Sequence, residues 1–191
     1  TVLFKSWRMS HPFLPRSPRL GALGYPKTGV LTKGGVQQSD FLWFCRLHPG
    51  VQACWRTVWG LRDDEGLVAS FDGCGAWRNP FHDAHAGSDV ATEGKWYHID
   101  QAHARTPERI GYQGIVQITA ADQASGSLVV VPGSHRDYRA NCERGGKKPR
   151  GNFVRMSPKA DGLYCAARAR QVAPLAAGDV ATWDSRVVHC S

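Results

Sequence analysis

The chain has 191 residues, of which 42% are hydrophobic, which is typical of one globular domain with a buried core and not of a disordered protein. No apolar run reaches the length of a membrane-spanning helix, so we expect a soluble protein without a membrane partner. The net charge of +8 favours anionic partners, either nucleic acid or small phosphate- or carboxylate-bearing molecules, although general solubility explains it equally well.

The first residue is Thr1, and the opening segment lacks the charged-then-apolar layout of a signal peptide, so we expect that the natural N-terminus is missing or was processed. Residues 1–35 are rich in proline and glycine, which predicts an irregular segment ahead of a single domain over residues 36–191. The six cysteines form no CxxC pair. We therefore expect free thiols in a reducing compartment, which implies a cytoplasmic location.

Residues 39–60 have a helical pattern on both sides of Pro49-Gly50, with Ser39 or Asp40 as the expected cap of the first helix. These helices would form a buttress for the rest of the domain. The tryptophans at helical spacing in the second half are more typical of a packed face than of a ligand platform.

After Gly66 the pattern changes to short strands separated by turns, which predicts a β core over residues 66–191. Along the strand that begins near Tyr112, we expect Ile115 and Ile118 on one face and Gln113 and Gln117 on the other. The predicted strands are "LVASFDG" (67–73), "GYQGIVQITAAD" (111–122), "GSLVVVPGSH" (126–135), "RARQVAP" (168–174) and "GDVATWDSRVVHCS" (178–191). Helices before many short strands indicate a mainly β sandwich or jelly roll with flanking helices.

The segment "KWYHIDQ" (95–101) places His98 and Asp100 two residues apart, on the same face of an expected strand. One imidazole and one carboxylate are two members of the 2-His-1-carboxylate triad that binds iron(II) and leaves coordination positions open. Among the eight histidines, His189 is the best third ligand because it lies on a strongly β-patterned apolar run. Spacing alone leaves an alternative open. His98 and Asp100 would then form an ordinary ion pair on a strand, and His189 would be a hydrogen-bonded core histidine.

A second histidine pair, His82 and His85, lies in the polar segment "NPFHDAHAGSD". Such a cluster suits a metal ion too, but segments of Asn, Asp, Ser and Gly are often plain turns.

Three segments in this order, "WYHIDQ", "YQGIVQITAADQASGSLVVVPGSHR" and "GDVATWDSRVVHC", resemble the phytanoyl-CoA dioxygenase-like family of iron(II)- and 2-oxoglutarate-dependent oxygenases. The resemblance covers about residues 66–191. It implies a double-stranded β-helix (a cupin-like jelly roll), with His98, Asp100 and His189 as iron ligands. It also implies that Gln113 and Ser191 contact the cosubstrate 2-oxoglutarate, and that O2 is consumed.

By the same resemblance, an arginine about ten residues after His189 would pair with the far carboxylate of 2-oxoglutarate, a task that suits a bidentate guanidinium. Since the chain ends at Ser191, we expect a fragment that lacks this arginine and the last strand of the jelly roll. Asp184 and Arg186 are expected to form a structural ion pair.

The implied reaction is hydroxylation or oxidative demethylation of a small molecule, and an anionic substrate would suit the basic segment 144–159. Two alternatives remain from the sequence. One is an oxygenase that acts on nucleic acid, which the charge favours. The other is a metal-binding jelly roll without turnover, which the missing arginine favours.

Overall fold

The computed structural model describes residues 23–25, 27–77, 92–144, 151–157 and 161–191. The chain divides into two compact units, Thr1–Leu42 with Phe71–Thr92, and Trp43–Ser70 with Glu93–Ser191. The expected boundary at residue 35 stays a prediction. None of the helices in the described ranges combines the length and apolar character that crossing a lipid bilayer requires.

The first unit contains a small antiparallel sheet with the order β1-β2-β3, made of β1 (Gly24–Tyr25), β2 (Val30–Leu31) and β3 (Cys74–Gly75). A short 3-10 helix, η1 (Val36–Gln38), comes after β2 in the chain. The strand predicted over residues 67–73 is wrong, because the segment has no regular structure and β3 begins only at Cys74. Val68 is fully exposed and Phe71 is 67% exposed, so the apolar residues of this segment bury little surface that would favour a strand.

The two helices predicted over residues 39–60 are present as α2 (Asp40–Leu47) and α3 (Pro49–Trp59). The Ser39 hydroxyl accepts a hydrogen bond from the backbone N–H of Leu42 at 3.4 Å, as expected of an N-cap. At the start of α3, His48 Nδ1 accepts from the N–H of Gly50 at 3.2 Å, and Pro49 occupies the first turn.

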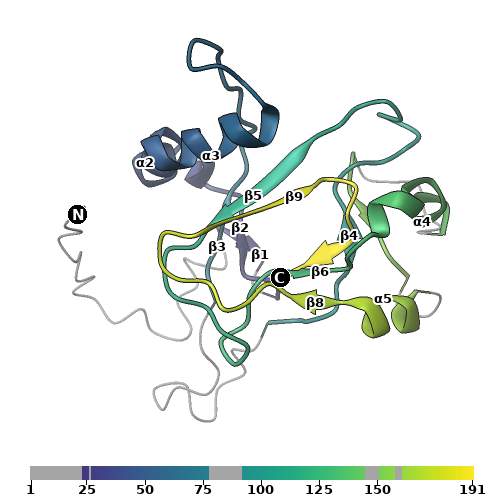
Figure 1. Cartoon of the computed structure of the whole chain (residues 1–191). Helices are drawn as coiled ribbons and strands as arrows, with labels where there is room; N and C mark the ends of the chain where they lie inside the picture. Colours follow the sequence, from purple (N-terminus) through teal and green to yellow (C-terminus); the bar gives the residue numbers. More distant parts are fainter. Residues whose placement is uncertain (1–22, 26, 78–91, 145–150, 158–160) are drawn as a thin grey trace. The chain divides into compact units, whose positions relative to one another are not determined.

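The second unit holds two antiparallel sheets (Figure 1). The strands of the five-stranded sheet, in the order β7-β4-β10-β6-β8, are β4 (His98–Ile99), β6 (Val129–Val130), β7 (Val154–Arg155), β8 (Arg170–Gln171) and β10 (His189–Cys190). The two-stranded sheet pairs β5 (Tyr112–Val116) with β9 (Val180–Asp184). The expectation of a mainly β fold with flanking helices is confirmed, although no sheet among the described residues closes into a barrel.

The strand pairing is nested along the chain. β4 pairs with β10, β5 with β9, and β6 with β8, while β10 also pairs with β6. The segment between β6 and β8 contains η3 (Ser134–Asp137), α4 (Tyr138–Arg144), β7 and α5 (Gly162–Arg168). Because β7 pairs with β4, this insertion returns to the five-stranded sheet and adds its edge strand beside β4.

The hydrophobic core of the second unit lies on one face of the five-stranded sheet, where α4 and α5 cover it (Figure 1). Ile99, Val131 and Val188 are fully buried there, as is Cys165 of α5, and Tyr138 of α4 is 7% exposed. Since side chains alternate along a strand, the residues between these core positions face the opposite side.

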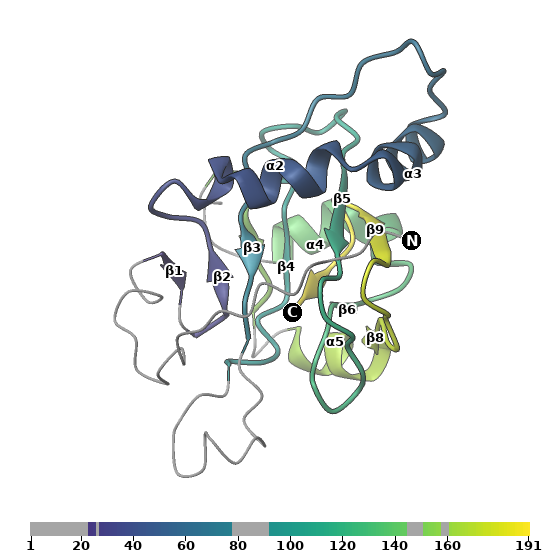
Figure 2. The same cartoon turned by 90° about the vertical axis from the view of Figure 1, so that its left-hand side faces the viewer.

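The outer face of β5 packs against α3. A Cβ atom on Gly114 would lie only 2.7 Å from the Trp55 ring, so the helix contacts the strand closely at this point. Trp59 also meets Tyr112 edge-to-face, at 4.8 Å between ring centroids. Figure 2 shows β5 and β9 side by side near α3.

The strand geometry corrects one prediction. Gln113 and Ile115 share the face of β5 opposite to Tyr112 and Gly114, because they are two residues apart in a regular strand. Gln113 therefore lies on the inner side of the strand together with an apolar residue.

Candidate metal centre

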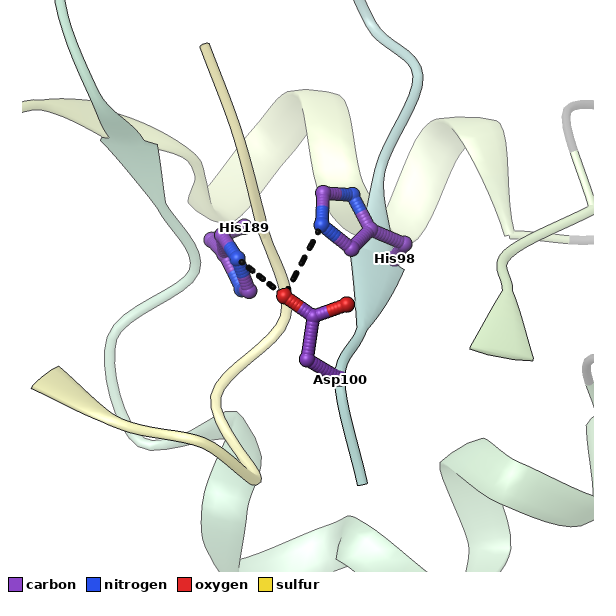
Figure 3. Close-up of side chains that lie close together, drawn as sticks. All are labelled: His98, Asp100 and His189. Atoms are coloured by element: carbon purple, nitrogen blue, oxygen red, sulfur yellow. Dashed lines mark ion pairs between the residues drawn. The ribbon is translucent and has the colours of Figure 1, made fainter. Parts of the chain in front are cut away.

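The three predicted metal ligands converge at one point (Figure 3). His98 and His189 lie directly opposite each other on paired strands β4 and β10, and Asp100 comes directly after β4. Each histidine Nε2 lies 3.4 Å from Asp100 Oδ2. One ligand atom from each residue lies within 4.8 Å of the others, and within the described ranges this is the one group of three or more His, Cys, Asp or Glu side chains so arranged.

The backbone fixes which imidazole nitrogen is available. His98 Nδ1 lies 3.2 Å from the carbonyl oxygen of Trp96, and His189 Nδ1 lies 2.9 Å from that of Val187. A carbonyl oxygen can only accept, so Nδ1 carries the proton in both rings and Nε2 keeps its lone pair. This is the tautomer that a metal-binding histidine requires, with the second ring nitrogen held by a hydrogen bond.

Burial and charge favour the protonation states that bind a metal. Both imidazoles are 4% exposed, and burial lowers the pKa of His98, with a further lowering from neighbouring His189, against the opposing effect of Asp100. Burial raises the pKa of Asp100, but the neighbouring imidazoles of His189 and His98 outweigh this effect and hold the pKa well below its usual range. A neutral His98 and an ionised Asp100 are ready to donate electron pairs without first losing a proton.

Aromatic rings surround the two imidazoles. Trp96 stacks on His98 at 4.5 Å between centroids, and Phe153 stacks on the same ring at 4.7 Å. Trp183 of β9 lies at 5.1 Å from the ring of His189. Phe153 was not among the residues predicted from the sequence, because its position depends on the pairing of β7 with β4. The sequence offered one signal for its role, which is an aromatic residue within a polar, basic segment.

The two residues predicted to contact a cosubstrate lie beside the three ligands. Gln113 Nε2 donates to Asp100 Oδ2 at 2.7 Å, and Gln113 Oε1 accepts from Trp183 Nε1 at 2.9 Å. Ser191 is half-buried, and its carbonyl oxygen accepts a hydrogen bond from Trp96 Nε1 at 2.7 Å.

The expected ion pair between Asp184 and Arg186 is present, with an Nη2–Oδ2 distance of 2.5 Å. This carboxylate also accepts a hydrogen bond from the backbone N–H of Arg186 at 2.8 Å, so the pair holds the turn between β9 and β10.

The alternative cluster of His82 and His85 lies outside the described residues. All six cysteines are free, as expected, and burial raises the pKa of Cys190, beside His189, to about 11.

Comparison with known proteins gives one result that bears on identity. The family model of phytanoyl-CoA dioxygenase (PhyH) matches residues 25–191, which include all three converging residues. No curated protein and no solved structure matches the chain. Because the family match spans most of the sequence, the chain belongs to the phytanoyl-CoA dioxygenase family.

Proposed function

We propose that this protein is an iron(II)- and 2-oxoglutarate-dependent dioxygenase that hydroxylates, or oxidatively demethylates, a small molecule. The observation that carries the proposal is the meeting of His98, Asp100 and His189 in a chain of this family. Two imidazole nitrogens and one carboxylate form the donor set of mononuclear iron(II) oxygenases, and they leave positions open for other ligands. The bound iron, with 2-oxoglutarate and O2, would supply the oxidation of a C–H bond.

The protein's own residues would prepare and shield this centre. His98 and His189 present Nε2 because their Nδ1 atoms are held by backbone carbonyls, and the core behind the strands keeps both rings in place. The side chain of Asp100 is 30% exposed, so the approach to the ligands is open from one side. We propose that Ser191 and Gln113 contact the cosubstrate, on the ground that both lie beside the ligands.

We propose that the β core is a double-stranded β-helix. The nested pairing supports this proposal, because a long antiparallel hairpin that is rolled up pairs its strands from the tip outwards, as β6–β8, β5–β9 and β4–β10 do here. The further pairing of β10 with β6 is the contact that rolling the hairpin creates.

For the substrate we propose an anionic small molecule. Arg155 lies directly opposite His98 across β7 and β4, and directly opposite residues of an antiparallel pair extend to the same face. Its guanidinium lies 3.7 Å from the Glu93 carboxylate, and both side chains are exposed. An ion pair of this kind is weak, so an anionic substrate could compete with Glu93 for Arg155. The free thiols support a cytoplasmic location for this reaction.

The test is an anaerobic titration of the protein with iron(II) and 2-oxoglutarate, and then exposure to air. A weak visible charge-transfer band and the formation of succinate are the expected results. Iron binding with neither band nor succinate would instead favour a metal-binding domain without turnover.

Asp100→Ala should abolish the band and the succinate, because it removes one of three ligands, while the circular dichroism spectrum stays unchanged. Asp63→Ala is the matched control, since Asp63 is an exposed aspartate outside the site. Undiminished succinate formation by the Asp100 variant would show that the ligand assignment is wrong.

A further inference from the structure

The amide of Gln113 has a unique orientation. The indole Nε1 of Trp183 can only donate, so the atom 2.9 Å from it must be the amide oxygen. An ionised carboxylate can only accept, so the atom 2.7 Å from Asp100 Oδ2 must be the amide nitrogen. Gln113 and Trp183 are also direct partners in the β5–β9 register, which holds the two side chains on the same face.

The hydrogen bond from Gln113 goes to the carboxylate oxygen that both imidazoles face. His98 Nε2 and His189 Nε2 each lie 3.4 Å from Asp100 Oδ2, the same atom that accepts from Gln113. Asp100 comes after a strand of only two residues, and its side chain is 30% exposed, so strand pairing and burial constrain it less than they constrain the histidines. A carboxylate in this situation needs an external partner to hold one oxygen toward the imidazoles.

We propose that Gln113 is a positioning residue, which Trp183 holds in place and which turns Asp100 Oδ2 toward His98 and His189. The inference rests on the proposed function, and it adds that the two-stranded sheet sets the geometry of a ligand carried by the five-stranded sheet. Trp183 serves the site twice, by orienting the Gln113 amide and by packing its ring against His189.

Gln113→Met tests the proposal, because methionine keeps the length of the side chain and removes its donor and acceptor. The control is Gln117→Met, which makes the same change four residues along, where the amide donates to the carbonyl oxygen of Thr119. Both variants and the wild type are titrated anaerobically with cobalt(II) as a stable substitute for iron(II). The affinity and the visible cobalt absorption are recorded, together with the melting temperature of the metal-free protein.

We expect Gln113→Met to bind cobalt(II) about 10–100-fold more weakly than the wild type, with an altered cobalt spectrum, and Gln117→Met to match the wild type. Trp183→Phe keeps Gln113 itself but removes the bond that orients its amide, so a loss of about 2–10-fold is expected. If Gln113→Met does not fold, this second variant still tests whether the oriented amide of Gln113 positions Asp100.

Wild-type affinity and spectrum in the Gln113 and Trp183 variants would overturn the inference and leave the proposed function intact. An equal loss in Gln117→Met would also overturn it, because the effect would not be specific to Asp100. A wild-type protein that binds no cobalt(II) would overturn both the inference and the metal site. Cobalt binding without succinate formation on iron would overturn the proposed function alone.

Discussion

Gly114→Ala is the sharpest test of the scaffold behind the candidate metal centre. The added Cβ would lie 2.7 Å from Cζ2 and 3.1 Å from Cη2 of Trp55, and 3.2 Å from the carbonyl oxygen of Ala181. The first distance is shorter than carbon atoms tolerate, so α3 or the indole must move. Overpacking of this kind costs about 1–3 kcal/mol. For a chain of this length, that loss lowers the melting temperature by roughly 2–12 °C.

The assay is thermal unfolding of a double-mutant cycle with Trp55→Phe, which removes the ring atoms that the new methyl group would meet. Gly114→Ala should cost less in the Trp55→Phe background than in the wild type, with a coupling of about 0.5–3 kcal/mol. Gly66→Ala is the control, because nothing lies within 4 Å of its added Cβ. If Gly114→Ala is as stable as Gly66→Ala, then α3 does not pack on β5 as described.

Two further changes probe the surroundings of the site. Phe153→Leu removes the ring stacked on His98 and should weaken cobalt(II) binding by up to about 10-fold, in line with the 0.5–1.5 kcal/mol of an aromatic pair. Asp184→Asn should lower stability by about 1–3 kcal/mol at pH 7, because burial raises the pKa of Asp184 but hydrogen bonds from Arg186 lower it by more. The deficit should disappear as the pH falls through the lowered folded-state pKa, since the wild-type carboxylate is then protonated in both states; a deficit independent of pH would contradict this assignment.

The sequence predicted those parts of the structure that depend on local periodicity and on one recognisable order of segments. His98 and Asp100 had to share a face because they are two residues apart, and His189 was indicated by an apolar β run. The helices on either side of Pro49 were predictable from their apolar spacing and their caps. In each case the information lies within a few neighbouring residues.

The pairing of strands that are distant in the sequence could not be predicted. The contact of Phe153 with His98 depends on the insertion between β6 and β8 returning to pair with β4. The prediction that Gln113 and Ile115 lie on opposite faces of β5 is wrong, because they are two residues apart in a regular strand. The pattern "YQGIV" mixes polar and apolar residues on both faces, so it does not indicate which face is buried. The polar partner that explains Gln113 is Asp100, which lies on another strand segment and has no signature in the sequence around Gln113.

The geometry of the candidate metal centre depends on the apolar core more than on contacts among His98, Asp100 and His189 themselves. His98 stands between Tyr97 and Ile99, which are 9% and 0% exposed, and His189 stands between Val188 and Cys190, which are 0% and 3% exposed. Because alternate residues face opposite sides, burying these four neighbours turns both imidazoles away from the core and toward Asp100. A slip of one residue in either strand would expose an apolar side chain worth about 1.5–3 kcal/mol of burial and place an imidazole in the core. The same burial that stabilises the sheet therefore selects the one register in which the three side chains meet.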